Sequence, residues 1–221
     1  MVALCFWAGA AEARQVCAAR VCFSDDGGPT GYAHAILGDV PEWREVRGPG
    51  WVLRPAHGFF EDIRPVVVDV TGDGLAEILV VQTDLKLGAR LMVISPQGKV
   101  LGVTPYIGQP HRWLAQAGVG DFDGDGRIEI AYVDRPHLLK ELVFLRLEGG
   151  NLREVARVPG LANHRIGDTA ISSRVRDCGQ GAEVLLASGD WTRLMAVRIG
   201  LKRDLGPYSP KAMQTALACA Q

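Results

Sequence analysis

The chain has 221 residues, of which 48% are hydrophobic and 22% are charged, and its formal net charge is −1. This length and composition suit a soluble, monomeric protein with one ordinary hydrophobic core. The basic residues are dispersed, which argues against nucleic acid as a partner. We expect no transmembrane segment, because no stretch reaches the roughly 20 apolar residues that a spanning helix needs.

The N-terminus has the pattern of an export signal. Met1 to Ala10 is short and apolar, and Ala11-Glu12-Ala13 has the small-x-small form of a signal-peptidase site, which predicts a signal peptide over residues 1–13. A positively charged start is missing, so either the true start lies upstream or the segment is a buried first strand. Residues 14–221 are expected to form a single domain.

The cysteine count fits an oxidising compartment. If Cys5 leaves with the signal peptide, an even number of cysteines remains, as in secreted or periplasmic proteins. Of the three ways to pair them, we favour Cys17 with Cys22 and Cys178 with Cys219. A zinc site is the competing use, although a lone Cys-x4-Cys falls short of four ligands at a familiar spacing.

Two acidic loops dominate the sequence: the first acidic loop, residues 69–77 (DVTGDGLAE), and the second acidic loop, residues 121–129 (DFDGDGRIE). Oxygen ligands at positions 1, 3 and 5 and a glycine at position 6 are typical of calcium coordination. We therefore expect one or two calcium ions, with weaker binding in the first loop because Thr71 replaces a carboxylate. The expected ligands are Asp69, Thr71, Asp73, the Leu75 carbonyl and Glu77, and Asp121, Asp123, Asp125, the Arg127 carbonyl and Glu129.

Two other interpretations of these loops are an EF-hand and a metal-free turn. An EF-hand requires a bidentate Glu at position 12, where Val80 and Tyr132 stand, and it requires flanking helices, which Pro65 and the β-rich flanks oppose. A metal-free Asp-Gly hairpin turn remains open for both loops.

The loops belong to a longer repeat. Glu77, Glu129 and Glu183 close three copies at spacings of 52 and 54 residues. The third copy has lost its ligands, because Val175 and Gly179 stand at positions 1 and 5, so a structural turn is expected there. Each copy continues into two strands, predicted at residues 77–84 and 90–94, 129–134 and 142–147, and 183–190 and 193–199.

A period of about 40 to 50 residues with four short strands per unit is typical of a β-propeller blade. We predict an all-β propeller of about four blades, in which the N-terminal and third acidic-loop copies are degenerate. Strand-like pieces at residues 32–37, 43–46 and 51–53 would form the N-terminal blade. A solenoid usually repeats faster. The ring is either incomplete or closed by pairing of the chain ends.

These residues resemble the FG-GAP or VCBS repeats of integrin-α-like β-propellers, over roughly Phe60 to Ile199. The resemblance implies a calcium-stiffened, extracytoplasmic scaffold that binds a protein or carbohydrate ligand, and it implies no particular reaction.

The same resemblance places a candidate ligand site on the face opposite the acidic loops. His111 and His164, 53 residues apart, would lie there beside arginine, aspartate and tryptophan residues able to bind an anionic or sugar-like ligand. The alternative is structural bridging, for example Arg112 to Asp134 or Arg165 to Asp190. The candidate residues are His111, Arg112, Trp113, Asp134, His137, His164, Arg165 and Asp190.

We therefore predict a calcium-binding propeller that serves as a binding or structural scaffold. The alternative is a propeller lyase or hydrolase that acts on a polysaccharide or other polyanion at the channel mouth. No nucleophile, phosphate-binding glycine loop or metalloprotease motif indicates catalysis, so no catalytic residue is assigned.

Overall fold

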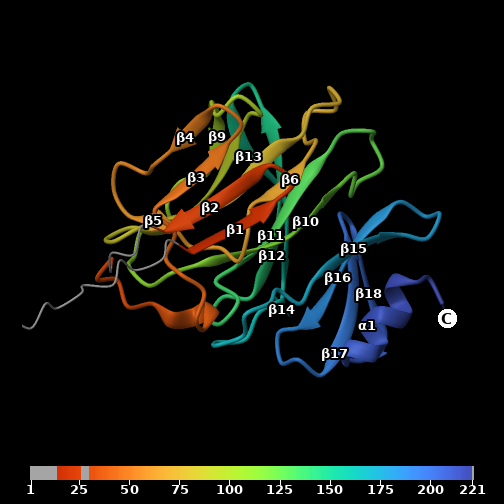
Figure 1. Cartoon of the computed structure of the whole chain (residues 1–221). Helices are drawn as coiled ribbons and strands as arrows, with labels where there is room; N and C mark the ends of the chain where they lie inside the picture. The colour runs from red at the N-terminus through yellow and green to blue at the C-terminus, as the bar shows by residue number, and fades with distance from the viewer. Residues whose placement is uncertain (1–13, 26–29, 221) are drawn as a thin grey trace, which may run out of the picture.

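A computed structural model describes residues 14–25 and 30–220 (Figure 1). The predicted signal peptide lies outside the described residues. The structure is built from strands, with a short 3-10 helix, η1 (Ala35–Leu37), and one α-helix, α1 (Pro210–Leu217). The described residues include no helix of the length and apolar character that a membrane crossing requires.

The strands form four antiparallel sheets, which confirms the all-β prediction. Sheet A contains β1 (Arg14–Ala18), β2 (Val21–Asp25), β3 (Glu45–Gly48) and β4 (Trp51–Leu53). Sheet B contains β5 (Phe59–Phe60), β6 (Val66–Val68), β7 (Glu77–Asp84), β8 (Gly88–Ile94) and β9 (Val100–Val103). Sheet C contains β10 (Leu114–Gly120), β11 (Glu129–Asp134), β12 (Glu141–Glu148) and β13 (Asn151–Pro159). Sheet D contains β14 (Leu161–Ala162), β15 (Arg174–Asp177), β16 (Ala182–Ser188), β17 (Arg193–Arg198) and β18 (Leu201–Pro207).

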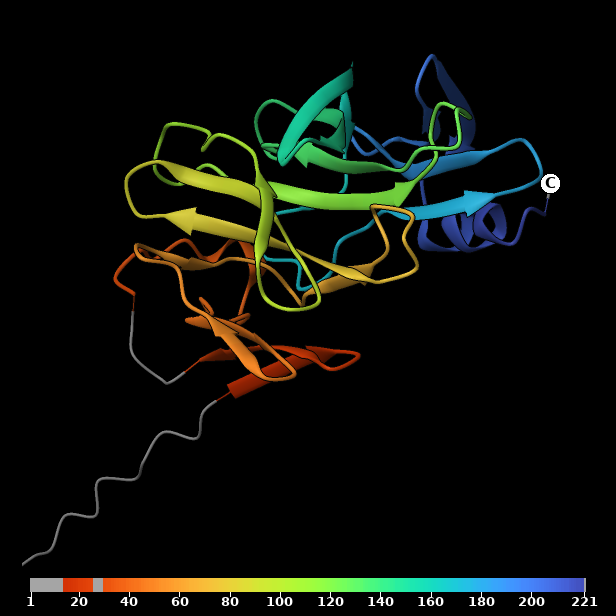
Figure 2. The ribbon, with the colours of Figure 1, turned by 90° about the horizontal axis from the view of Figure 1, so that it is seen from above.

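The sheets follow one another in chain order, like the blades of a four-bladed propeller that is not closed (Figure 2). Sheet C approaches sheet D closely at Gly118, where an added Cβ would lie 2.1 Å from Cγ2 of Val175. The strands of sheets A and D do not pair in the described part of the chain. Instead, the N–H of Gly167 donates to the carbonyl of Ile36 at 2.8 Å, which links the loop of sheet D to η1.

Apolar side chains on both faces of the inner strands hold the sheets together. On β7, Leu79 and Val81 pack into the core shared with sheet C, while Ile78 and Val80 pack into the core shared with sheet A. This double burial explains the uninterrupted apolar run in β7, because a strand covered on both faces loses the usual alternation. Burial of each such side chain is worth about 1.5–3 kcal/mol.

Sequence patterns located the inner strands well and the first unit less well. The bounds of β7 and β11 match the predicted strands. The strand predicted at residues 32–37 is wrong: this segment contains η1, and Ile36 and Leu37 insert into the core of sheets B and C. The first blade instead begins with the β1–β2 hairpin. Cys17 and Cys22 face each other in that hairpin and form the predicted disulfide.

The first strand of two blades is interrupted. In sheet D, β14 and β15 both pair with β16, and residues 163–173 leave the sheet between them. In sheet B, β5 and β6 pair with β7 in the same way. These interruptions place polar residues at the centre of the molecule, including Asn163 and His164, which are buried.

Candidate functional site

The second acidic loop joins β10 to β11 and is organised by its own carboxylates. Asp121 accepts hydrogen bonds from the backbone N–H groups of Gly124 at 2.7 Å and Gly126 at 2.9 Å. Both glycines have positive φ angles, 80° and 84°, a conformation that other residues rarely adopt. Glu129 closes the loop by accepting the N–H of Phe122 at 2.9 Å, while the Phe122 ring is buried in the core. The loop is therefore held in shape from both ends.

Three carboxylates of this loop converge. Oxygens of Asp121, Asp123 and Glu129 all lie within 4.8 Å of one another. Hard carboxylate oxygens at this separation suit calcium, so the donor set fits the ion that the motif predicts. Asp125 adds a fourth negative charge, and its pKa is lowered, chiefly by a hydrogen bond from the N–H of Arg127.

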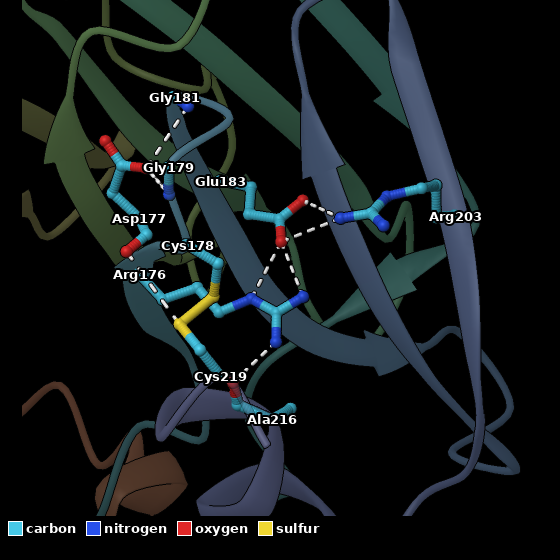
Figure 3. The surroundings of a disulfide bond; sticks show 9 residues. All are labelled: Arg176, Asp177, Cys178, Gly179, Gly181, Glu183, Arg203, Ala216 and Cys219. Carbon is cyan, nitrogen blue, oxygen red and sulfur yellow. Dashed lines mark hydrogen bonds and ion pairs between the residues drawn. A yellow bond between two sulfur atoms is a disulfide. The ribbon is translucent and has the colours of Figure 1, made fainter. Parts of the chain in front are cut away.

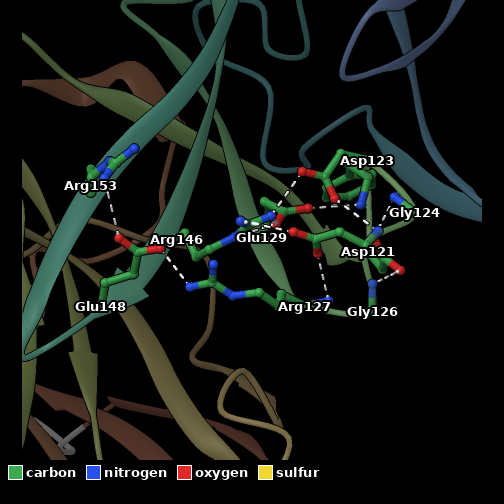
Figure 4. A network of polar contacts seen from close by, with 11 residues as sticks. Asp121, Asp123, Gly124, Gly126, Arg127, Glu129, Arg146, Glu148 and Arg153 are labelled. Atoms are coloured by element: carbon green, nitrogen blue, oxygen red, sulfur yellow. Dashed lines mark hydrogen bonds and ion pairs between the residues drawn. The ribbon is translucent and has the colours of Figure 1, made fainter.

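An arginine from the neighbouring strand also reaches this cluster (Figure 4). Arg146 on β12 lies opposite Glu129 in the register, and its Nε donates to Glu129 at 2.7 Å. Its Nη atoms lie 2.9 Å from Asp123 and 3.1 Å from Asp125. Burial alone lowers the pKa of Arg146, but the hydrogen bonds to Glu129 and Asp123 outweigh it and raise that pKa. Sequence analysis missed Arg146, because its role depends on strand register.

The first acidic loop repeats the same turn between β6 and β7. Asp69 accepts the N–H groups of Gly72 at 2.6 Å and Gly74 at 2.8 Å, and Glu77 accepts the N–H of Val70 at 2.9 Å. Its carboxylates do not form a cluster like that of the second loop in the described part of the chain. The backbone carbonyls of Leu75 and Arg127, and the side chain of Thr71, remain predicted ligands.

The comparison with protein families now bears on both loops. Residues 69–132 match the model of the FG-GAP-like repeat, a segment that runs from Asp69 through both acidic loops to Tyr132. The chain therefore contains an FG-GAP-like repeat segment, and the match covers both acidic loops. A comparison with curated proteins and another with solved structures found no match.

The third turn, residues 177–183, is held by hydrogen bonds, ion pairs and a disulfide (Figure 3). Asp177 accepts the N–H groups of Gly179 and Gly181, two and four residues further on, whereas the first aspartate of each acidic loop accepts those three and five residues further on. Glu183 pairs with two arginines, Arg176 and Arg203, at 2.6 and 2.7 Å. The predicted Cys178–Cys219 disulfide ties this turn to the residues after α1.

On a separate surface, the predicted ligand residues gather only in part. His137 and His164 hydrogen bond at 2.9 Å, and Trp113 packs against both rings at centroid distances of 6.2 and 5.0 Å. His34, which sequence analysis missed, joins His111 at 5.2 Å between ring centroids. We call this group, His34, His111, Trp113, His137 and His164, the histidine mouth. His34, His111, Trp113 and His137 line a hollow of about 20 Å³, which has room for one water molecule, and His164 lies behind them against His137 and Trp113.

Hydrogen bonding fixes the tautomers in the histidine mouth. Nε2 of His164 lies 2.8 Å from the carbonyl oxygen of Asp168, which can only accept, so this nitrogen carries a proton. Nδ1 of the neutral His164 ring then accepts a hydrogen bond from Nε2 of His137. Burial and the nearby His164 lower the pKa of His137 to about 4, so both rings are neutral at pH 7. Nδ1 of His34 lies at hydrogen-bonding distance, 2.8 Å, from Oε1 of Glu61.

His111 and His164 are not equivalent positions, despite their 53-residue offset. His111 precedes β10 and stacks on Tyr32 at 4.4 Å, whereas His164 follows β14 in the interruption of the first strand. Arg112 lines the hollow with His111. The histidine mouth thus combines residues next to the strands of sheets C and D with His34, which precedes η1 and lies outside the repeat pattern.

The remaining candidates have other partners. Asp134 pairs with Arg135 and Arg157, so the expected bridge from Arg112 is replaced by closer arginines. Arg165 lies over the Trp191 ring at 4.2 Å. Asp190 accepts hydrogen bonds from Ser188 and Thr192 within its own turn, which lower its pKa to about 2. These contacts are local, and the expected bridge from Arg165 to Asp190 is not among them.

Proposed function

We propose that this protein is an exported, calcium-binding scaffold in which calcium stabilises the acidic loops of a propeller-like fold. The observation that carries the proposal is the convergence of Asp121, Asp123 and Glu129 within a segment that matches the FG-GAP-like repeat. The identical turn at Asp69 supports a second, weaker site. Two disulfides suit the oxidising compartment that export implies.

The loops' own residues explain how a cation would act. Each loop concentrates carboxylates at the end of a hairpin, and their mutual repulsion opposes the folded turn. Asp121, Asp123, Asp125 and Glu129 would hold the ion in the second loop, and Asp69, Asp73 and Glu77 in the first. Bound calcium supplies positive charge that offsets this repulsion. Because Phe122 and Val70 anchor the loops in two cores, a stiffer loop stabilises the contacts between sheets.

The test is thermal and urea unfolding of the oxidised protein in chelator, in millimolar calcium and in millimolar magnesium. A ligand that binds only the native state stabilises it by mass action, by about 2.7 kcal/mol at one hundred times Kd. We expect a rise in stability that calcium produces and magnesium does not. Asp125→Ala should remove most of the gain from the second loop, and adding Asp73→Ala should remove the remainder.

Asp39→Ala is the matched control, because Asp39 is exposed and lies outside both loops. It should respond to calcium as the wild type does. If the double variant and the wild type gain the same stability from calcium, the site assignment is wrong. If the wild type gains none, the loops are Asp-Gly turns without a metal.

The second part of the proposal is that the histidine mouth contacts a ligand or partner at its rim. Its hollow holds no more than a water molecule, but Arg112, Leu138 and His111 are accessible around it. A partner would therefore lie across the surface of the mouth. This arrangement suits a binding face better than a catalytic pocket, because an enclosed substrate site needs a larger volume.

A further inference from the structure

A second hollow, of about 480 Å³, opens where sheet A meets sheet B. Its walls come from the segment after β4, from β5, from the edges of β7, β8 and β9, and from the loop after β9. Pockets of this volume are of the size that holds a small organic molecule. Neither the acidic loops nor the histidine mouth contributes to it.

The floor of this cleft is apolar. Phe60 is fully buried and Met92 nearly so, and both belong to the core between sheets A and B. Leu53 and Val100 line the cleft beside them. The cleft is thus an extension of the core that the protein's own side chains leave open at the edge of the sheet.

A polar pair interrupts the apolar face at this point. Gln82 on β7 and Arg90 on β8 are cross-strand neighbours, and Gln82 shares its face of β7 with the core residues Ile78 and Val80. Gln82 is buried, with 4% of its surface exposed. A buried polar residue is unusual at a position that would otherwise complete an apolar core, and contact with a polar ligand would account for it.

The contacts of Arg90 leave the Nη edge of its guanidinium available to a ligand. Its Nε donates to Oε1 of Gln82 at 2.8 Å, and its Cζ lies 4.4 Å from the centroid of the Tyr106 ring. Its Nη atoms have no hydrogen-bond partner among the described residues. Burial raises the pKa of Tyr106, so the ring stays neutral beneath the cation. A guanidinium fixed on two sides is prepared for bidentate contact with an anion.

Among the described residues that line the cleft, Arg90 is a cation without an ion-pair partner. Arg54 at the rim is already paired with the buried Glu45. Asp84 caps its own turn, accepting the N–H groups of Lys86 and Leu87 through Oδ1. His57 stands on the Arg54 side of the cleft.

We propose that this cleft binds a small amphiphilic anion, with its carboxylate or sulfonate on Arg90 and its apolar body over Phe60 and Met92. Neutral ligands lack the charge that Arg90 recognises, and fully polar anions leave the apolar floor exposed to water. The site is independent of the acidic loops, so the proposal does not rest on calcium binding.

The test compares two fluorescent probes that differ in charge. One is 1-anilinonaphthalene-8-sulfonate, and the other is N-phenyl-1-naphthylamine, which has the same aromatic body without the sulfonate. We expect the sulfonate to bind one site per chain about tenfold more tightly than the amine, as one charge-assisted contact of about 1.5 kcal/mol implies. Octanoate should displace it, and octanol should displace it much less.

Arg90→Met should reduce the affinity for the sulfonate to that for the amine. Arg153→Met is the matched control, because the Arg153 side chain is 71% exposed on sheet C and should leave binding unchanged. If Arg90→Met does not fold, Tyr106→Leu, which removes the ring beneath the guanidinium, should still weaken sulfonate binding. Equal binding of the two probes to the wild type would overturn the proposal, as would a sulfonate affinity unchanged in the folded Arg90 or Tyr106 variant. Repeating the titration in chelator separates this site from the acidic loops.

Discussion

The two acidic loops have the same backbone turn in different surroundings. In each, the first aspartate accepts N–H groups at positions 4 and 6, and the closing glutamate accepts the N–H at position 2. The loops differ in the residue that the neighbouring strand places opposite the closing glutamate. Arg146 lies opposite Glu129 in the second loop, whereas continuing the β7–β8 register by one residue places Ser95 opposite Glu77 in the first.

This difference changes how each loop balances its charge. Arg146 contacts three of the four carboxylates of the second loop. In the first loop, Asp69, Asp73 and Glu77 form no ion pair within the described part of the chain. The same acidic turn thus forms with and without an arginine on the neighbouring strand. Because a residue outside the motif can supply positive charge to the loop, we predict that the two loops differ in how far they depend on calcium.

The largest effect is expected from Arg146→Ser, which gives the second loop the surroundings of the first. The change leaves Glu129, which is fully buried, without its cation. Breaking a buried ion pair from one side costs about 3–5 kcal/mol, so the free energy of unfolding in chelator should fall by that amount. Calcium should restore much of the loss, and urea unfolding with and without calcium measures both quantities.

Arg153→Ser serves as control for the loss of an arginine, since an exposed substitution should change stability by less than about 0.5 kcal/mol. A folded Arg146→Ser protein as stable as the wild type in chelator would show that Arg146 does not balance the loop. Equal calcium responses in the variant and the wild type would show that Arg146 and calcium do not compensate for the same charge.

Sequence patterns predicted the features that depend on local chemistry. The glycines and aspartates of the loops specify the turns, and the unbroken apolar run of β7 specifies a strand covered on both faces. The pairing favoured among the three possible ones, Cys17 with Cys22 and Cys178 with Cys219, is confirmed. The N-cap of α1, Ser209 before Pro210, was also readable in the sequence but was overlooked.

Features that depend on tertiary contacts could not be predicted in this way. The pattern of residues 32–37 suggests a strand, but Ile36 and Leu37 are buried at the centre between other sheets, and burial there overrides the local preference. The role of Arg146 depends on register, and the cleft at Arg90 depends on how sheet A lies against sheet B. His34 reaches the histidine mouth from outside the recognisable repeat.

The third turn extends the comparison, because Asp177 and Glu183 alone remain of its expected ligands and two arginines pair with Glu183. Burial raises the pKa of the Glu183 carboxyl, but the hydrogen bonds from Arg203 and Arg176 lower that pKa by more. Its pKa in the folded state is therefore below the ordinary value. Glu183 therefore stabilises the fold above pH 4.5, and this contribution is lost as the pH falls through its folded pKa.

Glu183→Gln should lower stability at pH 7 by about 2 kcal/mol, the scale of a hydrogen bond to a charged group. The loss relative to wild type should shrink as the pH falls below 4.5, and it should be the same with and without calcium. Urea unfolding at pH 7 and pH 4 measures it. A calcium-dependent loss would mean that the third turn still responds to the ion.

The reverse exchange, Ser95→Arg, has the smallest expected effect and tests the comparison most directly. Ser95 is buried, and its Oγ accepts the N–H groups of Gln97 and Lys99, so the substitution breaks a turn while it adds a guanidinium opposite Glu77. These contributions oppose each other, and the net change in chelator should stay within about 1 kcal/mol.

Ser95→Ala breaks the same turn without adding charge. The difference between the Arg and Ala variants therefore isolates the guanidinium, and we expect the Arg variant to gain less stability from calcium than the Ala variant. Equal gains would mean that the strand opposite the closing glutamate does not determine the calcium dependence of these loops.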